Sequence, residues 1–212
     1  MPSFAGRIVA VLSACAAVFC TVATADAQIY AKLNVLYACV GVVNPQVEFR
    51  LSPHSAFQTE VVYSPWKSVR GRHMEFGIFL NEYRYYIRNT GQGFYVAADA
   101  GLMAFNMSRP RIGGVKLVWF DDNHGKGYGY MVGLAIGYEY RFKERWLLDV
   151  FIGGAYMNSM YNGYYADGRI EMNPHRPPSK QPSSPDPFNG SAETLPHKIG
   201  LSIGYLIFNP KK

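Results

Sequence analysis

The segment from Tyr128 to Phe142, YGYMVGLAIGYEYRF, alternates strictly between two kinds of residue. One set of alternate positions holds Tyr, Val, Leu, Ile and Phe, and the other holds mostly Gly and Ala, with Met131, Glu139 and Arg141. A period of two residues is typical of a β-strand, in which successive side chains point to opposite faces of the sheet. The segment therefore predicts a strand with one apolar face. That face contacts either a protein core or lipid, and the choice decides the fold class.

Further segments with this alternation precede and follow it, and each ends in turn residues such as Gly, Pro, Asn and Ser. The eight segments are, roughly, 30–39, 44–51, 55–63, 73–88, 94–105, 128–142, 146–161 and 197–208. No comparable stretch has a helical period. The pattern predicts an all-β protein of eight antiparallel strands.

The fourth of these segments breaks the pattern. Its apolar residues from Phe76 to Leu80 share one face with Glu82 and Arg84. We expect one β-bulge near Leu80 or Asn81, which would place the charged residues on the same side as those of the other strands.

The connections between the segments alternate in length. Three tight connections, at 52–55, 89–93 and 143–145, fall between longer ones at 64–72, 106–126 and 162–196. In an up-and-down barrel, every long loop then lies at one end, and both chain termini lie with the tight turns at the other, as in outer-membrane barrels. The last connection, 162–196, is rich in Pro and Ser, and we expect it to be mostly disordered.

The residues opposite the apolar face decide between a soluble and a membrane barrel. Strand positions that face water normally carry long or branched polar side chains, whereas this face carries Gly129, Gly133 and, in the last segment, Gly200. Small residues suit the narrow interior of an eight-stranded barrel. Tyr and Phe near the strand ends, with aliphatic residues between them, are typical of the aromatic girdles that face lipid. We predict an eight-stranded antiparallel up-and-down transmembrane β-barrel.

Charged residues of both signs, five basic and six acidic, fall on the small-residue face. They are Lys32, Glu48, Arg50, Glu60, Glu82, Arg84, Asp99, Glu139, Arg141, Asp149 and Lys198. Buried charges are tolerated when they are paired and hydrogen-bonded. We expect them to form a structural network that fills the lumen, because eight strands leave no open aqueous channel.

The first 27 residues have the features of a secretory signal peptide. Arg7 precedes an apolar run, and Ala25-Asp26-Ala27 fits a cleavage site, which makes residues 28–212 the mature barrel. Lipoprotein processing at Cys15 is a second, less favoured interpretation, since the apolar run continues past this residue. After cleavage at residue 27 only Cys39 remains, which excludes a disulfide-stapled scaffold.

Two groups of polar residues raise the question of a metal or catalytic site. The stretch 121–127, DDNHGKG, has carboxylate, amide and imidazole ligands but lacks the spacing of a calcium loop. The histidines, with several serines, form no recognisable catalytic motif; they are His54, His73, His124, His175 and His197. We therefore predict no metal, no cofactor and no enzymatic activity.

Basic residues gather in the long connections of a chain whose net charge is +6. They include Lys67, Arg70, Arg72, Arg109 and Arg111. Two interpretations stay open: attraction of anionic lipopolysaccharide at the cell surface, or simple solubility. Nucleic acid is not an expected partner, because the basic residues lie in loops and the aromatic residues are expected to face lipid.

Four short stretches are similar to a known family. They are LNVLYA (33–38), NPQVEFRL (44–51), YSPWKS (63–68) and EYRYYI (82–87). They resemble the small outer-membrane β-barrel proteins of Gram-negative bacteria catalogued as domain of unknown function 3575. The resemblance implies an outer-membrane barrel without an established activity, and it supplies no catalytic residues.

The expected function is that of a non-enzymatic barrel in the outer membrane of a Gram-negative bacterium. Its lumen would be packed and charge-paired, and its role structural or, through the extracellular loops, surface-binding. Its expected partners are membrane lipids, lipopolysaccharide or another envelope protein. Two alternatives stay open: an outer-membrane enzyme acting on lipid or lipopolysaccharide, and a soluble, lipocalin-like periplasmic binder.

Overall fold

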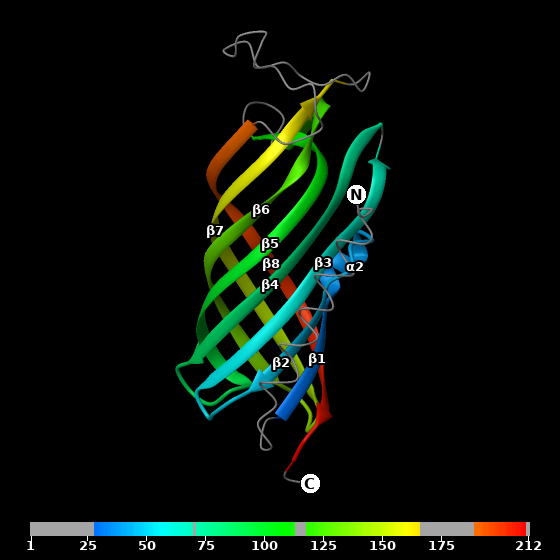
Figure 1. Cartoon of the computed structure of the whole chain (residues 1–212). Helices are drawn as coiled ribbons and strands as arrows, with labels where there is room; N and C mark the ends of the chain where they lie inside the picture. The colour runs from blue at the N-terminus through cyan, green and yellow to red at the C-terminus, as the bar shows by residue number, and fades with distance from the viewer. Residues whose placement is uncertain (1–27, 70, 113–117, 166–188, 211–212) are drawn as a thin grey trace.

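The chain forms a single sheet that closes on itself. The computed structural model describes residues 28–69, 71–112, 118–165 and 189–210. Its elements are β1 (Gln28–Asn34), α2 (Val35–Cys39), β2 (Pro45–Arg50), β3 (Ser55–Val69), β4 (Arg72–Tyr86), β5 (Gln92–Ile112), β6 (Val118–Arg141), β7 (Trp146–Tyr164) and β8 (Asn189–Phe208) (Figure 1). Each strand pairs with the next in antiparallel fashion, and β1 pairs with β8, so the order is that of a closed barrel. This confirms the prediction of an all-β, eight-stranded, up-and-down sheet.

The two ends of the barrel differ. The hairpins β2–β3, β4–β5 and β6–β7 turn tightly at one end, where Ile29 of β1 lies opposite Phe208 of β8 (Figure 1). Gly91, in the turn between β4 and β5, has a φ of 81°, a backbone conformation that favours glycine. We call this end the turn end and the opposite one the upper end.

At the upper end the strands are longer than predicted. β5 and β6 pair from Gln92 opposite Tyr140 up to Ile112 opposite Val118, so most of 106–126 is strand and 121–127 belongs to β6. β3 likewise runs on to Val69. The prediction of a disordered segment at 162–196 is wrong for its two ends, which lie in β7 and β8, while 166–188 falls outside the described residues. Backbone ladders continue here although the apolar alternation of the side chains has faded.

The first predicted strand is shorter than expected. β1 ends at Asn34, and Val35–Cys39 form one turn of helix, so the prediction of a strand up to Cys39 is wrong. The Asn34 side chain caps this helix by accepting hydrogen bonds from the backbone N–H groups of Leu36, at 3.1 Å, and Tyr37, at 3.4 Å. The wall of the barrel is therefore built differently between β1 and β2 than elsewhere.

β4 has no bulge in the region where one was predicted. Its register is continuous from Met74 to Tyr85 against β3 and from Met74 to Tyr86 against β5, which makes the predicted bulge near Leu80 or Asn81 wrong. Leu80 points inward with Glu82 and packs against Met131 and Ala155. The apolar and charged residues of β4 share one face because the interior itself changes from charged to apolar along the barrel.

The outward face of the barrel is apolar and the inward face largely polar. Along β6, Leu134 is 70% exposed whereas Met131 and Glu139 are buried, and Tyr128 and Tyr140 are about half exposed. The buried residues of the described chain include more polar and charged side chains than hydrophobic ones. This is the reverse of the usual distribution in a water-soluble domain. Among the described residues, no helix is long and apolar enough to cross a membrane.

Candidate functional site

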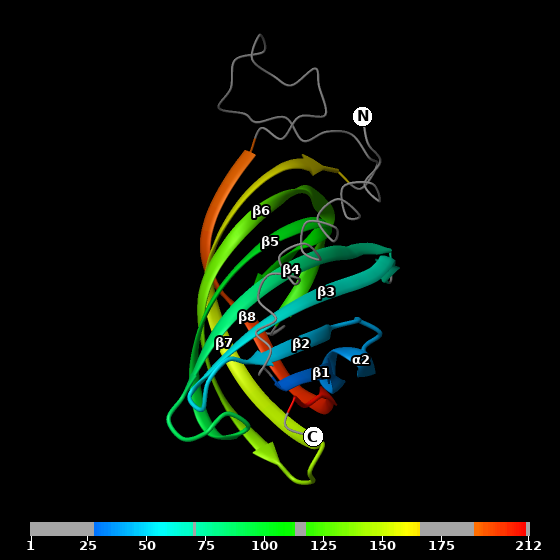
Figure 2. The ribbon, with the colours of Figure 1, turned by 60° about the horizontal axis from the view of Figure 1, so that its bottom comes forward.

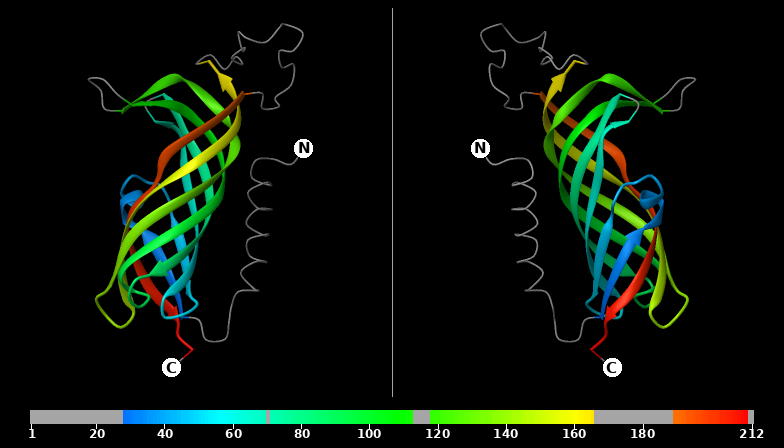
Figure 3. Two further views of the ribbon diagram at one scale, coloured as in Figure 1. Left: turned by 90° about the vertical axis from the view of Figure 1, so that its left-hand side faces the viewer. Right: turned by 90° about the vertical axis from the view of Figure 1, so that its right-hand side faces the viewer.

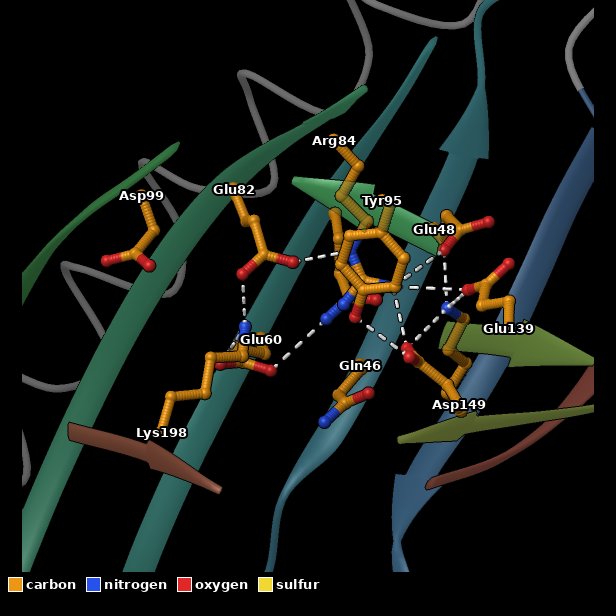
Figure 4. A network of polar contacts seen from close by, with 12 residues as sticks. Gln46, Glu48, Glu60, Glu82, Arg84, Tyr95, Asp99, Glu139, Asp149 and Lys198 are labelled. Atoms are coloured by element: carbon orange, nitrogen blue, oxygen red, sulfur yellow. Dashed lines mark hydrogen bonds and ion pairs between the residues drawn. The ribbon is translucent and has the colours of Figure 1, made fainter. Parts of the chain in front are cut away.

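The densest group of charged side chains lies inside the barrel, close to the turn ends of its strands (Figure 4). We call it the charged network: Lys32, Glu48, Arg50, Arg84, Glu139 and Asp149. These three cations and three anions come from β1, β2, β4, β6 and β7. Each lies at an inward position of its strand, so the two-residue period of the strands is what brings them together.

Lys32 on β1 contacts carboxylates on β2 and on two strands distant in the sequence, β6 and β7. Its Nζ contacts Oε2 of Glu48 and Oε1 of Glu139, and it lies 3.1 Å from Oδ2 of Asp149. All four side chains are closed to solvent. An ammonium group has three protons to donate, and Lys32 has one carboxylate for each.

Arg84 makes a second set of contacts to the same carboxylates. Its Nη1 lies 2.6 Å from Asp149 Oδ2, 3.1 Å from Glu139 Oε1 and 3.2 Å from Glu48 Oε2. Its Nε donates to Oε1 of Glu82. The guanidinium group carries five N–H donors in a fixed fork, which lets one side chain bridge several carboxylates.

Arg50 completes the charge balance on the turn-end side. Its Nε lies 3.3 Å from Glu48 Oε1 and its Nη2 lies 3.5 Å from Glu139 Oε2. With Lys32 and Arg84, it gives three positive charges against the three carboxylates of the network.

Three buried tyrosines line the charged network. The Arg50 guanidinium lies 3.9 Å from the ring centre of Tyr30, and that of Arg84 lies 4.5 Å from the ring centre of Tyr95. The hydroxyl of Tyr95 donates to Asp149 at 2.8 Å, and that of Tyr86 donates to Glu48 at 3.4 Å. The tyrosines thus supply both cation–π contacts and hydrogen bonds while they fill the lumen.

A second charged group lies farther from the turn end. Lys198 Nζ is 2.6 Å from Glu82 Oε2 and 3.0 Å from Glu60 Oε1. Because Glu82 also binds Arg84, this group is connected to the charged network (Figure 4). Asp99 stands apart and pairs with His197, at 3.1 Å.

The charged network closes the part of the lumen that it occupies. The side chains of the charged network are almost fully buried and carry balanced charge. Removing one partner would leave an uncompensated buried charge, at a cost of about 3–5 kcal/mol. The described residues include no cluster of three or more His, Cys, Asp or Glu side chains that could hold a metal ion.

Of the eleven charged residues predicted to lie in the lumen, ten are buried in the barrel. Arg141 is only half-buried, and its Nε atom is enclosed without a hydrogen-bond partner. It is the last residue of β6, at the turn end.

Four of the five predicted basic residues lie on strands rather than in loops. Lys67 is exposed on β3, and Arg72 is half-buried at the start of β4. Arg70 lies outside the described residues, as do the side chains of Arg109 and Arg111 on β5.

Sequence reasoning missed the aromatic and histidine contributions to the interior. Tyr86 shares its face with Glu82 and Arg84, so the alternation of β4 could have placed it inside. His197, at the start of the last predicted strand, pairs inside the barrel with Asp99. The other described histidines lie toward the two ends of the barrel, His54 at the turn end and His73 and His124 at the upper end, whereas His175 lies outside the described residues.

Comparison with known proteins places this barrel in a family. Neither the curated proteins nor the solved structures include a match to the chain. One family model, described as "Protein of unknown function (DUF3575)", matches residues 10–180. The match covers most of the chain, including the strands that carry Lys32, Glu48, Arg84, Glu139 and Asp149. The chain therefore belongs to the DUF3575 family.

Proposed function

We propose that this protein is an integral β-barrel of the outer membrane of a Gram-negative bacterium. Its strands span the lipid, the charged network closes its lumen, and its role is structural or surface-binding, without catalysis. The observation that carries the proposal is the inverted distribution of side chains, with hydrophobic residues outside and paired charges inside.

The outward apolar residues form a band with aromatic borders. On β6, Val132, Leu134 and Ile136 are more than half exposed and lie between tyrosines. On β7, Val150 and Ile152 are equally exposed and lie between Trp146 and Tyr156. Leaving such a side chain in water forgoes roughly 1.5–3 kcal/mol of burial free energy. Lipid would cover the whole band, and aromatic girdles at its borders are typical of outer-membrane barrels.

A polar row marks the upper limit of this band. Glu75, Asn106 and Lys126 are cross-strand neighbours on β4, β5 and β6 and lie at outward positions of their strands. Their neighbour on β7, Asn162, is polar but buried. The next row toward the turn end includes Tyr128 and Met160, which are exposed and apolar or aromatic. We place the boundary with the lipid head groups between these rows, so that the longer strand ends project beyond the membrane.

The same distribution argues against a soluble, lipocalin-like binder. Such a barrel would hold its apolar residues inside and present polar ones to water. Here the interior near the turn end is occupied by ion pairs and tyrosines, and the exterior would leave Leu134 and its neighbours in water. The strand ends beyond the apolar band, where Lys67 is exposed, are the parts available to lipopolysaccharide or an envelope partner.

Membrane fractionation tests this proposal. We expect the chain, expressed in a Gram-negative host, to appear in the outer-membrane fraction and to resist extraction with carbonate or urea. We also expect its migration on a gel to change after boiling, because the closed sheet survives in detergent until it is heated. A mature chain that stays soluble and monomeric without detergent would contradict the proposal.

A further inference from the structure

The interior above the charged groups is lined largely by apolar side chains, some of which remain partly exposed. Leu80 and Met131 are almost fully buried, and Ile78, Met103 and Met157 pack against them while remaining partly exposed. We call these five residues the upper cup. By contrast, the side chains of the charged network are almost completely closed to solvent. The lumen therefore consists of a sealed polar section and, above it, an apolar section with accessible walls.

The wall beside the upper cup lacks a continuous strand ladder. β1 and β2 are much shorter than their neighbours (Figure 2). β1 pairs with β8 only up to Ser202, and β2 pairs with β3 only up to Glu60. Beyond these points, the described residues of β3 and β8 face the break without a partner strand, apart from one bridge between Val43 and Tyr63. We call this interruption the ladder break.

A few side chains and the helix α2 hold the ladder break together. Asn44 Nδ2 donates to the carbonyl of Val61 on β3, at 3.0 Å, and Asn34 Nδ2 donates to that of Ile199 on β8, at 3.3 Å. α2 also contacts β8, and Figure 3 shows it about halfway up the barrel. β3 is also tied to this part of the wall by two backbone hydrogen bonds between Val43 and Tyr63 and by one from Trp66 Nε1 to the carbonyl of Val40, at 3.1 Å. On the β8 side, the described contacts beyond Ser202 are the hydrogen bond from Asn34 to Ile199 and the packing of α2, so this side can separate at lower cost than a paired strand interface.

A small cavity connects the ladder break with the upper cup. It has a volume of about 10 Å³, room for roughly one water molecule. From the break, Tyr37 of α2, Val62 of β3 and His197 of β8 line it. From the interior, Ile78, Leu80 and Met131 line it. The cavity therefore adjoins both the ladder break and the upper cup, and Glu60 and Lys198 also contribute to its wall.

We propose that one hydrocarbon chain of a membrane lipid enters through the ladder break and lies in the upper cup. This inference rests on the proposed membrane location. The outer surface at the break carries the exposed apolar side chains of Leu36, Val40 and Ile199, which lipid chains would contact. Methionine is flexible and polarizable, so a wall containing three methionines adapts to a flexible chain.

The charges below the upper cup fix the orientation of the lipid. Lys198 is already neutralised by Glu60 and Glu82, which together leave an excess of one negative charge. An anionic head group would be repelled from this floor. The hydrocarbon end therefore enters the barrel, and the head group stays outside at the ladder break.

Photo-crosslinking in bilayers tests the inference. The mature protein would be reconstituted into vesicles of phosphatidylethanolamine and phosphatidylglycerol that contain a phosphatidylethanolamine with a diazirine at one chain end. After illumination, mass spectrometry locates the labelled residues. We expect label on the outward residues Leu134 and Ile136 and also on the inward residues Ile78 and Met131.

Two variants form a matched pair for this experiment. Met103→Trp adds volume inside the upper cup, and Leu102→Trp adds the same volume one residue away on the outward face. We expect Met103→Trp to reduce the inward label several-fold and Leu102→Trp to leave it unchanged. Outward label that persists in both variants shows that each is folded and inserted.

The outcomes separate this inference from the proposed function. Label confined to the outward residues would overturn lipid access to the upper cup while supporting membrane insertion. Inward label that is equal in both variants would also overturn it. Absence of label from both faces would overturn the membrane location, and the inference with it.

Discussion

Arg84 is the residue on which the charged interior depends most. It is completely buried and contacts four carboxylates, those of Glu48, Glu82, Glu139 and Asp149. Its position inside could be inferred from the alternation of β4, but its partners could not. They come from strands far apart in the sequence, and only closure of the barrel brings them within reach.

Replacement of Arg84 by Met should destabilise the protein by about 3–5 kcal/mol, because the carboxylates lose a buried cation. Urea unfolding of the protein in detergent micelles would measure the loss. Arg88→Met, four residues farther along in an exposed turn, is the control and should have little effect. Equal stabilities of the two variants would show that Arg84 does not hold the network together.

Gly91 offers a test of the turn that supports Arg50. It has a φ of 81°, and a Cβ placed on it would lie 2.8 Å from Arg50 Nη1. Gly71 has a similar φ of 80° but open space around it. We expect Gly91→Ala to lower the unfolding free energy more than Gly71→Ala, since only the first adds a clash to the backbone strain of roughly 1–3 kcal/mol. Similar losses in the two variants would mean that the Arg50 contact is unimportant.

His124 lies outside the proposed membrane band and should respond to pH. Its ring centre is 4.1 Å from that of His73, and its pKa is lowered by burial, by His73 and by Lys126. The folded state therefore takes up the proton less readily than the unfolded chain, so stability should fall as the pH drops below the ordinary histidine value. Unfolding midpoints at pH 7.5 and 5.5, compared with those of His124→Gln, would measure this. An unchanged pH response in the variant would contradict the prediction.

At the scale of elements, the two-residue alternation predicts inward and outward positions correctly where all side chains on one face of a strand lie in the same kind of environment. It placed the outward and inward residues of β6 correctly from Tyr128 to Arg141. It failed at Val35–Cys39, because one helical turn is too short to show a period and its apolar residues read equally well as strand. In β4 the alternation requires a bulge only if the interior is polar along the whole strand, whereas the interior becomes apolar at Leu80.

The junction of β1 and α2 depends on Asn34. Its side chain both caps α2 and holds the carbonyl of Ile199 on β8. We expect Asn34→Ala to cost about 1 kcal/mol from loss of the cap, with a further loss from the unmet carbonyl. Thermal unfolding compared with Asn158→Ala, at a half-buried outward position on β7, would measure the difference. If the two substitutions cost the same, Asn34 has no special role at the ladder break.

At the scale of the whole molecule, the distribution of side chains predicts a depth-dependent cost of charge. Leu134 lies in the middle of the apolar band and Tyr128 at its upper border. If lipid surrounds the band, Leu134→Arg should cost about 2–4 kcal/mol and Tyr128→Arg about 0–1 kcal/mol. Unfolding from lipid vesicles would measure both values. Equal, small costs would show that no membrane surrounds the band.

The connectivity of the charged network has a consequence for how the barrel assembles. Neighbouring strands can pair one hairpin at a time. Lys32, however, is separated from its partners Glu139 and Asp149 by 107 and 117 residues along the chain. Until β6 and β7 are in place, the ammonium group of Lys32 has, of its three described carboxylate partners, Glu48 alone within reach. If the barrel inserts into a membrane as proposed, an incomplete barrel would hold unmatched charge in lipid, which disfavours every half-built state. Closure should therefore be an all-or-none event, in which β1 and β8 meet as the last ion pairs form.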